Sequence, residues 1–313
     1  MAEANQEDLS FFHHERYLND LKSTKAGAVL VPIEFKEPIK HVPLLKVKSP
    51  SLAFNEIAKD LYASNDELDV TGIHETAIIG KGVRLDPESV SVGPYVVIGS
   101  DTEIGDGTTL SAGVRIGNNI SIGKKCSLFP NVVVYDHSQI GNNVQVHGGT
   151  VIGSDGFGFS PQKDGNYKKI PQTGIVILGN NVDVGSNSTI DRATLGVTSI
   201  GNGVKLDNQI QIAHNVEIGE NTVIAAQSGV AGSAKIGKNC VIGGQVGIVG
   251  HINIGDNVKI QGKSGVISNI KQSSTIQGTP AFSYNDYNKS YVYFKNLPNL
   301  AKEINRIIKK LNP

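Results

Sequence analysis

Aliphatic side chains recur at every sixth position over two long stretches of the chain, residues 92–152 and 200–266. A strict six-residue period is typical of a parallel β-helix, because one short strand and one corner together take six residues. One side chain per hexad then points into the axis, where β-branched Ile and Val pack well on a pleated surface. The pattern therefore predicts a mainly β solenoid. The predicted inward residues are Val92, Ile98, Ile104, Leu110, Ile116, Ile122, Leu128, Val134, Ile140, Val146, Ile152, Ile200, Leu206, Ile212, Ile218, Ile224, Val230, Ile236, Ile242, Ile248, Ile254, Ile260 and Val266.

Three hexads close one triangular coil of about eighteen residues, and successive coils rise by about 4.8 Å. Glycine often follows the inward residue, as Gly99 follows Ile98 and Gly237 follows Ile236. Glycine permits a sharp corner because it tolerates a positive φ. The hexads therefore predict a triangular prism whose corners lie outside the core.

The hexad is absent from residues 1–68, which we expect to form a small α/β domain. A short helix is predicted over 15–22, strands over 28–31 and 42–47, and a second helix is predicted to be capped by Ser51. The solenoid is expected over 69–279. Residues 280–313 return to helical spacing, which predicts an amphipathic C-terminal extension that packs on another surface.

Two interruptions break the hexad inside the solenoid. The inward positions Ile152 and Leu178 are separated by a gap that is not a multiple of six, so residues 153–174 must leave the coil. A second break lies between Ile190 and Ile200, around Asp191-Arg192.

Composition excludes several classes of protein. Lys plus Arg and Asp plus Glu are both 29, which argues against a nucleic-acid partner because such proteins present a basic face. No apolar run is long enough for a membrane span and no leader opens the chain, so we expect a cytoplasmic protein. Cys126 and Cys240 each stand two residues before an inward aliphatic residue, which predicts two reduced core cysteines.

Two of the eight histidines stand in related positions. His214 follows the inward Ile212 by two residues, and His251 follows the inward Ile248 by three. Their hexads are two whole coils apart, so the two imidazoles should share one edge of the prism, roughly 10 Å apart along its axis. They are either idle solvated corner residues or parts of a site. The closely spaced pair of histidines found in zinc-binding solenoids is missing, so we expect no metal and no cofactor.

A corner histidine suits acyl transfer. A neutral imidazole accepts a proton from an attacking amine or hydroxyl near pH 7. The tetrahedral oxyanion also needs a hydrogen-bond donor, and the backbone N–H of Gly232, one coil beyond His214, is a candidate. Asp207 and Asn208 stand one edge earlier, at the turn after Leu206.

Near the N-terminus, Phe11, His14 and Tyr17 are spaced by three residues. This spacing would put the two aromatic rings side by side, as a clamp for a nucleobase. The alternative is that they are core aromatics of a small domain.

Long motifs resemble the UDP-3-O-acylglucosamine N-acyltransferase family of lipid A biosynthesis over nearly the whole chain. They are GSDGFGF (153–159), KIPQTG (169–174), STIDR (188–192), KLDNQIQIAHNVEIGENTVIAAQ (205–227), AGSAKIG (231–237) and IGGQVGIVGH (242–251). The resemblance implies a left-handed parallel β-helix. It also implies transfer of a 3-hydroxyacyl chain from acyl carrier protein to the 2-amino group of UDP-3-O-(3-hydroxyacyl)-glucosamine.

The resemblance also implies roles for individual residues. His214 would be the general base, His251 would assist near the thioester and the sugar phosphates, and Gly232 would donate its N–H to the oxyanion. Phe11 and Tyr17 would bind the uracil, in a substrate site that includes His14, Asp207 and Asn208. The family is a homotrimer with active sites between subunits, and its C-terminal helices, here within 281–313, engage the carrier protein.

Two departures from the family pattern bear on substrate binding. His14 stands where the family usually has Asn. The family's N-terminal domain begins further upstream, so we expect the uridine-binding domain to be incomplete, with less core burial. The alternatives to this function are a related solenoid acyltransferase that uses another donor such as acetyl-CoA, and a non-catalytic solenoid.

Overall fold

A computed structural model describes residues 1–62, 71–279 and 281–311. The chain divides into two compact units, Met1–Val70 and Thr71–Pro313. The predicted boundary between residues 68 and 69 lies outside the described residues, and so does Pro280, where the C-terminal extension was predicted to begin.

The N-terminal unit is a small α/β fold, as predicted. Its parallel sheet has the strand order β1-β2-β3, and its core is built from Phe12, Leu21, Val29 and Val31. The elements are β1 (Leu9–Phe11), the 3-10 helix η1 (Glu15–Tyr17), α1 (Leu18–Ser23), β2 (Ala28–Pro32), β3 (Leu44–Val47) and α2 (Pro50–Tyr62).

The predicted role of Ser51 as a helix cap is wrong. Helix α2 begins at Pro50, and its first hydrogen bond runs from the Ala53 N–H to the Ser49 carbonyl. Proline is favoured at the first helical position because its missing N–H would have no partner there. Ser51 therefore lies inside the first turn.

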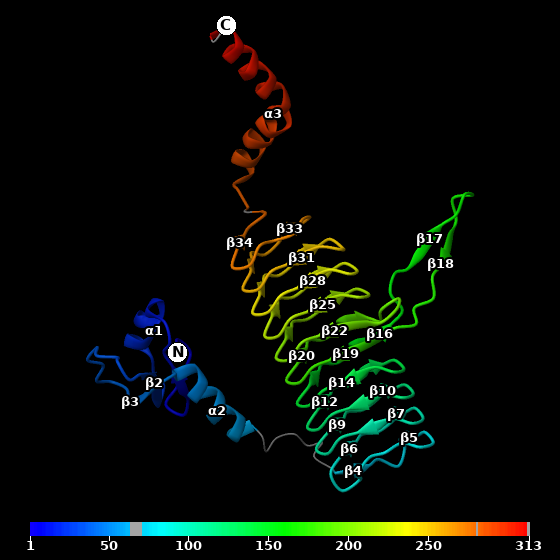
Figure 1. The fold of residues 1–313 in the computed structure, drawn as a ribbon. Coiled ribbons are helices and arrows are strands. Elements are labelled where there is room, and N and C mark those ends of the chain that lie inside the picture. Colours follow the sequence, from blue (N-terminus) through cyan, green and yellow to red (C-terminus); the bar gives the residue numbers. More distant parts are fainter. Residues whose placement is uncertain (63–70, 280, 312–313) are drawn as a thin grey trace. The chain divides into compact units, whose positions relative to one another are not determined.

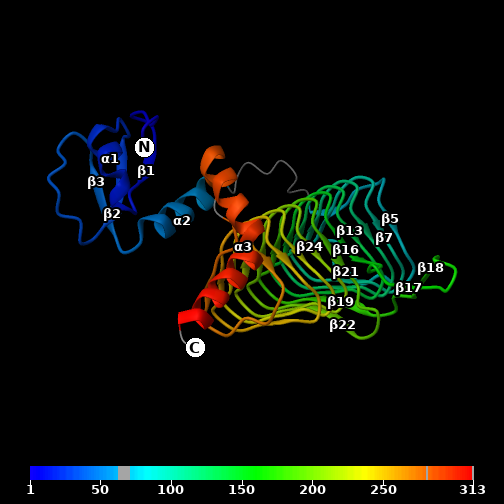
Figure 2. The same ribbon diagram turned by 90° about the horizontal axis from the view of Figure 1, so that it is seen from above.

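The second unit is a solenoid of stacked coils (Figures 1 and 2). Within the described residues its strands form three parallel sheets of ten, eight and eleven strands. The ten-stranded sheet contains β5 (Ile78–Ile79), β7 (Val97–Ile98), β10 (Arg115–Ile116), β13 (Val133–Val134), β16 (Val151–Ser154), β21 (Thr189–Asp191), β24 (Gln211–Ile212), β27 (Gly229–Val230), β30 (Gly247–Ile248) and β33 (Gly265–Val266).

The other two sheets complete the prism. The eight-stranded sheet contains β8 (Glu103–Ile104), β11 (Ser121–Ile122), β14 (Gln139–Ile140), β19 (Ile175–Leu178), β22 (Val197–Ile200), β25 (Glu217–Ile218), β28 (Lys235–Ile236) and β31 (Asn253–Ile254). The eleven-stranded sheet contains β4 (Gly72–Ile73), β6 (Ser91–Val92), β9 (Thr109–Leu110), β12 (Ser127–Leu128), β15 (Gln145–Val146), β20 (Asp183–Val184), β23 (Lys205–Leu206), β26 (Val223–Ile224), β29 (Val241–Ile242), β32 (Lys259–Ile260) and β34 (Thr275–Ile276).

The inward positions predicted from the hexads are confirmed. Every one of those residues is buried, and stacked partners such as Ile212, Val230 and Ile248 are separated by one coil in the strand register. The residue two positions before each inward residue is also buried. Cys126 and Cys240 occupy this position in their hexads and are free thiols. Burial raises the pKa of both thiols, which keeps them protonated and unreactive.

The two predicted interruptions are also confirmed. Ile152 pairs with Ile190 and Ile190 pairs with Ile212, so these two coils are longer than the regular ones. The first insertion forms an antiparallel hairpin of β17 (Phe159–Pro161) and β18 (Tyr167–Lys169), which projects from the prism in Figure 1.

The C-terminal extension is one helix, α3 (Tyr284–Leu311), which contains Pro298 and has no buried residue. The several helices implied by the resemblance are therefore a single helix in the described residues. Its apolar side chains, including Leu297, Ile304 and Ile308, remain exposed.

The stacked axis predicts a large difference between two Ile→Ala variants. Ile212 is fully buried, whereas Ile78 in the same sheet is 63% exposed. Ile212→Ala should lower the free energy of unfolding by about 2–5 kcal/mol because it leaves a cavity. Ile78→Ala should change it by less than about 0.5 kcal/mol. Denaturant titration followed by circular dichroism measures both, and equal losses would contradict a close-packed axis at Ile212.

Candidate active site

His214, Gly232 and His251 meet at one corner of the prism, the corner that follows the ten-stranded sheet. A Cβ built on Gly232 would lie only 2.5 Å from Nε2 of His214, so the imidazole lies directly over the Gly232 backbone. The His251 N–H donates to the Gly232 carbonyl at 3.1 Å. The hexad spacing therefore predicted correctly that the two histidines share an edge.

Several turns in other coils are capped by side chains of the next coil. The Ser100 N–H donates to Asn118 Oδ1 at 2.8 Å, and the Lys238 N–H donates to Asp256 Oδ1 at 2.8 Å. At the Gly232 turn the next coil carries Gly250, which has no side chain to accept a hydrogen bond. Within the described part of the chain, the Gly232 N–H donates to no protein acceptor. This donor is therefore available to a ligand oxygen beside His214.

The orientation of the His214 ring is fixed by its neighbour Asn215. The Asn215 side-chain amide donates from Nδ2 to the Leu195 carbonyl at 2.8 Å, which turns Oδ1 toward the histidine. Nδ1 of His214 lies 3.2 Å from that oxygen. Nδ1 then carries the proton in the neutral ring, so Nε2, on the Gly232 side, is left as the basic nitrogen.

The inserted segment covers the other side of the same ring. A Cβ on Gly156 would lie 2.8 Å from Cβ of His214, so a glycine is needed there. The buried Gln172 holds this segment: Nε2 donates to the Ile170 carbonyl at 3.0 Å, and Oε1 accepts from the Thr194 hydroxyl at 2.9 Å. Sequence analysis recognised the DGFGF motif but did not predict that it packs against His214.

An apolar groove of about 460 Å³ begins next to His214 on the outer face of the ten-stranded sheet. Its floor is a column of three stacked glycines, and a Cβ on any of them would meet no atom within 4 Å. We call this column the glycine furrow; it consists of Gly229, Gly247 and Gly265. The walls include Ala213, Ala231, Val249 and Ile267. Sequence analysis missed the furrow, although glycine precedes the inward residue in three successive coils.

Asp207 and Asn208 lie at a different corner, which follows the eleven-stranded sheet. The Asp207 carboxylate accepts from the N–H groups of Asn208, at 2.7 Å, and Ala226, at 3.1 Å. Asn208 Oδ1 accepts from the Ser186 N–H at 2.7 Å. Within one protomer these two residues cap turns and do not share the His214 corner.

Phe11, His14 and Tyr17 belong to the N-terminal unit. The ring of His13 contacts both aromatic rings, with its centroid 5.3 Å from that of Phe11 and 5.6 Å from that of Tyr17. Phe11 ends strand β1 and also contacts Phe54 at 4.8 Å, whereas Tyr17 ends the 3-10 helix η1. His14 caps η1, accepting the Arg16 N–H on Nδ1 at 3.1 Å.

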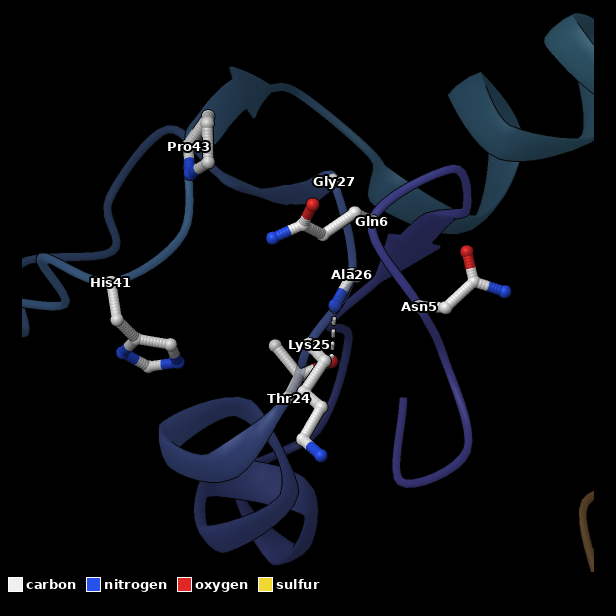
Figure 3. Close-up of a pocket in the computed structure, with 8 residues that line it drawn as sticks. All are labelled: Asn5, Gln6, Thr24, Lys25, Ala26, Gly27, His41 and Pro43. Carbon is white, nitrogen blue, oxygen red and sulfur yellow. Dashed lines mark hydrogen bonds between the residues drawn. The ribbon is translucent and has the colours of Figure 1, made fainter.

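The N-terminal unit also contains an open polar pocket of about 650 Å³. Figure 3 shows it between the loop at Gln6, the turn at Lys25 and the loop at His41. None of the residues that were predicted to bind substrate lines this pocket.

The described residues contain no group of three or more His, Cys, Asp or Glu side chains that could hold a metal ion. No helix among them has both the length and the apolar character that crossing a membrane requires.

The chain matches known proteins both by family model and by sequence. Residues 1–59 match the model for UDP-3-O-(3-hydroxymyristoyl) glucosamine N-acyltransferase, LpxD, and residues 87–118, 119–154 and 198–232 match the bacterial transferase hexapeptide model. The UDP-3-O-acylglucosamine N-acyltransferase of Christiangramia forsetii is 47% identical over 314 residues, which cover 100% of this chain and 91% of that protein. The protein of the same name from Coxiella burnetii (strain Dugway 5J108-111) is 44% identical over 230 residues, covering 74% of this chain but only 66% of the relative's length.

Solved structures give the same fold. An Arabidopsis UDP-N-acetylglucosamine acyltransferase is 25% identical with a TM-score of 0.55, over 67% of this chain and 71% of that one. The UDP-N-acetylglucosamine O-acyltransferase of Moraxella catarrhalis is 29% identical with a TM-score of 0.51, over 66% and 72%. The motifs, the solenoid and the full-length relative agree, and the chain belongs to the UDP-3-O-acylglucosamine N-acyltransferase family.

Proposed function

We propose that the chain is an N-acyltransferase of lipid A biosynthesis. It moves a 3-hydroxyacyl chain from acyl carrier protein to the 2-amino group of UDP-3-O-(3-hydroxyacyl)-glucosamine, in the cytoplasm and without a cofactor. The observation that carries the proposal is the His214 corner, where a basic imidazole nitrogen, an unused backbone N–H and an apolar groove adjoin one another.

The chemistry follows from the orientation of His214. Nε2 of His214 takes a proton from the acceptor amine as the amine nitrogen forms a bond to the thioester carbonyl carbon. The carbonyl oxygen becomes an oxyanion, and the Gly232 N–H donates to it, which contributes about 3 kcal/mol in comparable sites. The C–S bond then breaks, and the imidazolium returns the proton to the departing thiolate.

The glycine furrow supports a long acyl donor. It offers a narrow apolar floor that runs across successive coils, and an extended hydrocarbon chain buries its surface along such a floor. Acetyl-CoA would leave the furrow empty, so this observation favours the acyl-carrier-protein donor over the acetyl alternative.

The three faces of the prism differ in a way that supports a homotrimer. The ten-stranded sheet presents the apolar groove, and the eleven-stranded sheet presents the exposed Val223 and Val241. The eight-stranded sheet presents charged pairs such as Glu217–Lys235 at 2.7 Å. The eleven-stranded sheet also carries the Asp183–Lys205 ion pair at 2.7 Å, so only part of that face is apolar. Apolar patches on two unlike faces pack head to tail and close a ring.

The remaining roles complete the proposal. His251 binds near the thioester and the sugar phosphates, while Phe11, His14 and Tyr17 bind the uracil. The ring of His13 contacts both Phe11 and Tyr17, so it borders the proposed uracil site. Helix α3, whose apolar side chains are exposed, engages the carrier protein.

Substitution of His214 tests the reaction. His214→Ala should lower kcat at least about a hundredfold, because general-base catalysis contributes on that order or more, while circular dichroism and oligomeric state remain unchanged. The assay is mass spectrometry of the N-acylated sugar, made from purified acyl carrier protein thioester.

The matched control is His147→Ala. His147 is a half-buried corner histidine that stacks on Phe129 at 4.6 Å, away from the His214 corner. The His147→Ala variant should keep full activity. Full activity in His214→Ala would refute the proposed base, and absence of N-acylation by the unmodified protein would refute the proposed function.

Filling the glycine furrow should change the acyl-chain preference. Gly247→Leu places a side chain in open space above the floor, so the fold is kept while the groove is blocked. Activity with long 3-hydroxyacyl donors should fall about tenfold or more relative to short donors, because the blocked segment no longer buries several methylene groups. Lys235→Leu, at the equivalent position of the charged face, should leave the ratio unchanged. An unaltered ratio in Gly247→Leu would exclude the furrow as the acyl site.

Phe11→Ala should weaken binding of the UDP-sugar about tenfold while leaving carrier-protein binding unchanged, because a stacked base contributes about 1–3 kcal/mol. Isothermal titration calorimetry with each ligand measures both affinities. Phe129→Ala, in the solenoid, is the control for loss of an aromatic ring. Equal UDP-sugar affinity in Phe11→Ala and the unmodified protein would rule out the uracil contact.

A further inference from the structure

Asp191 is a buried carboxylate that the proposed mechanism does not use. It is the last residue of strand β21. Ile190 of this strand pairs with Ile212 of β24, so Asp191 lies one coil away from Ala213, the residue before His214. Its side chain lies on the outer face of the ten-stranded sheet. It contacts Gln211, which lines one end of the apolar groove. Only 8% of Asp191 is exposed.

The hydrogen-bond partners of this carboxylate are neutral. The Ser154 hydroxyl donates to Oδ1 at 3.1 Å, and the Gln211 amide donates from Nε2 to Oδ2 at 2.7 Å. The hydroxyl of Thr189 donates to the other end of the same amide, which fixes its orientation.

The nearby cations are engaged elsewhere. Arg192 donates to the carbonyls of Gly153, at 2.6 Å, and Asp136, at 3.0 Å. Lys169 pairs with Asp155. Among the residues that the structure describes, no lysine or arginine forms an ion pair with Asp191.

One short segment connects Asp191 to His214. Ser154 donates to the carboxylate, and Gly156, two residues later, packs against the His214 ring. The charged or titratable groups near the carboxylate are His214, Asp155 with its partner Lys169, and Arg192. Of these, only His214 changes its charge during the proposed reaction.

Burial raises the pKa of Asp191, and the hydrogen bonds from Ser154 and Gln211 and the nearby His214 act in the opposite direction. A carboxyl group whose pKa is raised by folding stabilises the fold fully below its unfolded pKa of about 3.9, and loses that stabilisation as the pH rises through the folded value. At neutral pH, an ionised Asp191 therefore lowers the free energy of unfolding relative to a neutral side chain at the same position.

We propose that Asp191 is a positioning residue that stabilises the positively charged His214 ring formed when Nε2 takes the proton of the acceptor amine. This inference rests on the proposed acyl transfer. A buried carboxylate without a cationic partner interacts strongly with a charge that appears nearby, because the local dielectric constant is low and no solvent screens it. Asp191 acts only through His214 and does not touch the reacting atoms.

Asp191→Asn tests the proposal because it removes the charge and keeps the shape. We expect kcat to fall on the order of tenfold with KM unchanged, partial recovery in Asp191→Glu, and a thermal midpoint at pH 7 no lower than that of the unmodified protein. The matched control is Glu217→Gln, which removes an exposed carboxylate three residues from His214 and should keep full activity.

A second measurement needs no substrate, so it separates this inference from the proposed function. Diethyl pyrocarbonate acylates neutral imidazoles, and the modification of His214 can be followed by peptide mass spectrometry as a function of pH. In Asp191→Asn the pH for half-maximal reaction of His214 should move to lower values than in the unmodified protein, because the variant lacks a negative charge near the ring. In Glu217→Gln it should stay in place.

Three results would overturn the proposal. They are an unchanged pH dependence of His214 modification, a rise in KM with kcat unchanged, and a fall in kcat that is accompanied by a lower thermal midpoint. The last would show that Asp191 serves the fold. If the unmodified protein transferred no acyl group while the modification profile still shifted, the proposed function would fail but the coupling between the two side chains would stand.

Discussion

Each coil of the solenoid is held over the next by two interactions that repeat along the axis. One is the packing of a single aliphatic side chain per hexad, and the other is the set of backbone hydrogen bonds between stacked two-residue strands. Together they fix the height and direction of every corner, because a coil that shifted would leave both cavities and unpaired backbone groups. A corner side chain therefore sits on a rigid support, which is what the His214 site requires.

The candidate site lies where glycines replace side chains that other coils of the repeat carry. Several turns are sealed by an Asn or Asp from the next coil, as at Ser100 and Lys238, but the turn at Gly232 is not, because Gly250 lies above it. Side chains also cover most outer strand positions, whereas three stacked glycines leave the furrow bare. A free N–H and an apolar groove thus result from missing side chains, at little cost to a fold whose stability resides in the axis.

Asp191 and Gly156 show that stability and function are separate requirements at this corner. The regular coils bury hydroxyls that donate to backbone carbonyls, such as Thr108 to Gly123 at 2.9 Å. Asp191 instead buries a charge between neutral partners, and Gly156 brings an inserted segment against the His214 ring. Both features lie in the two coils where the hexad is interrupted, and neither serves the packing of the axis.

The sequence by itself determined the axis of this protein and the corner that His214 and His251 share. In a solenoid the neighbour of each residue is set by the period, so the repeat directly gives which residues are inward and which stack. The tertiary structure decided what the period cannot encode. The contact of Gly156 with His214, the burial of Asp191 and the contact of Phe11 with Phe54 depend on the paths of non-repeating segments. Those paths are set by packing between residues far apart in the chain, for which a single sequence carries no spacing rule.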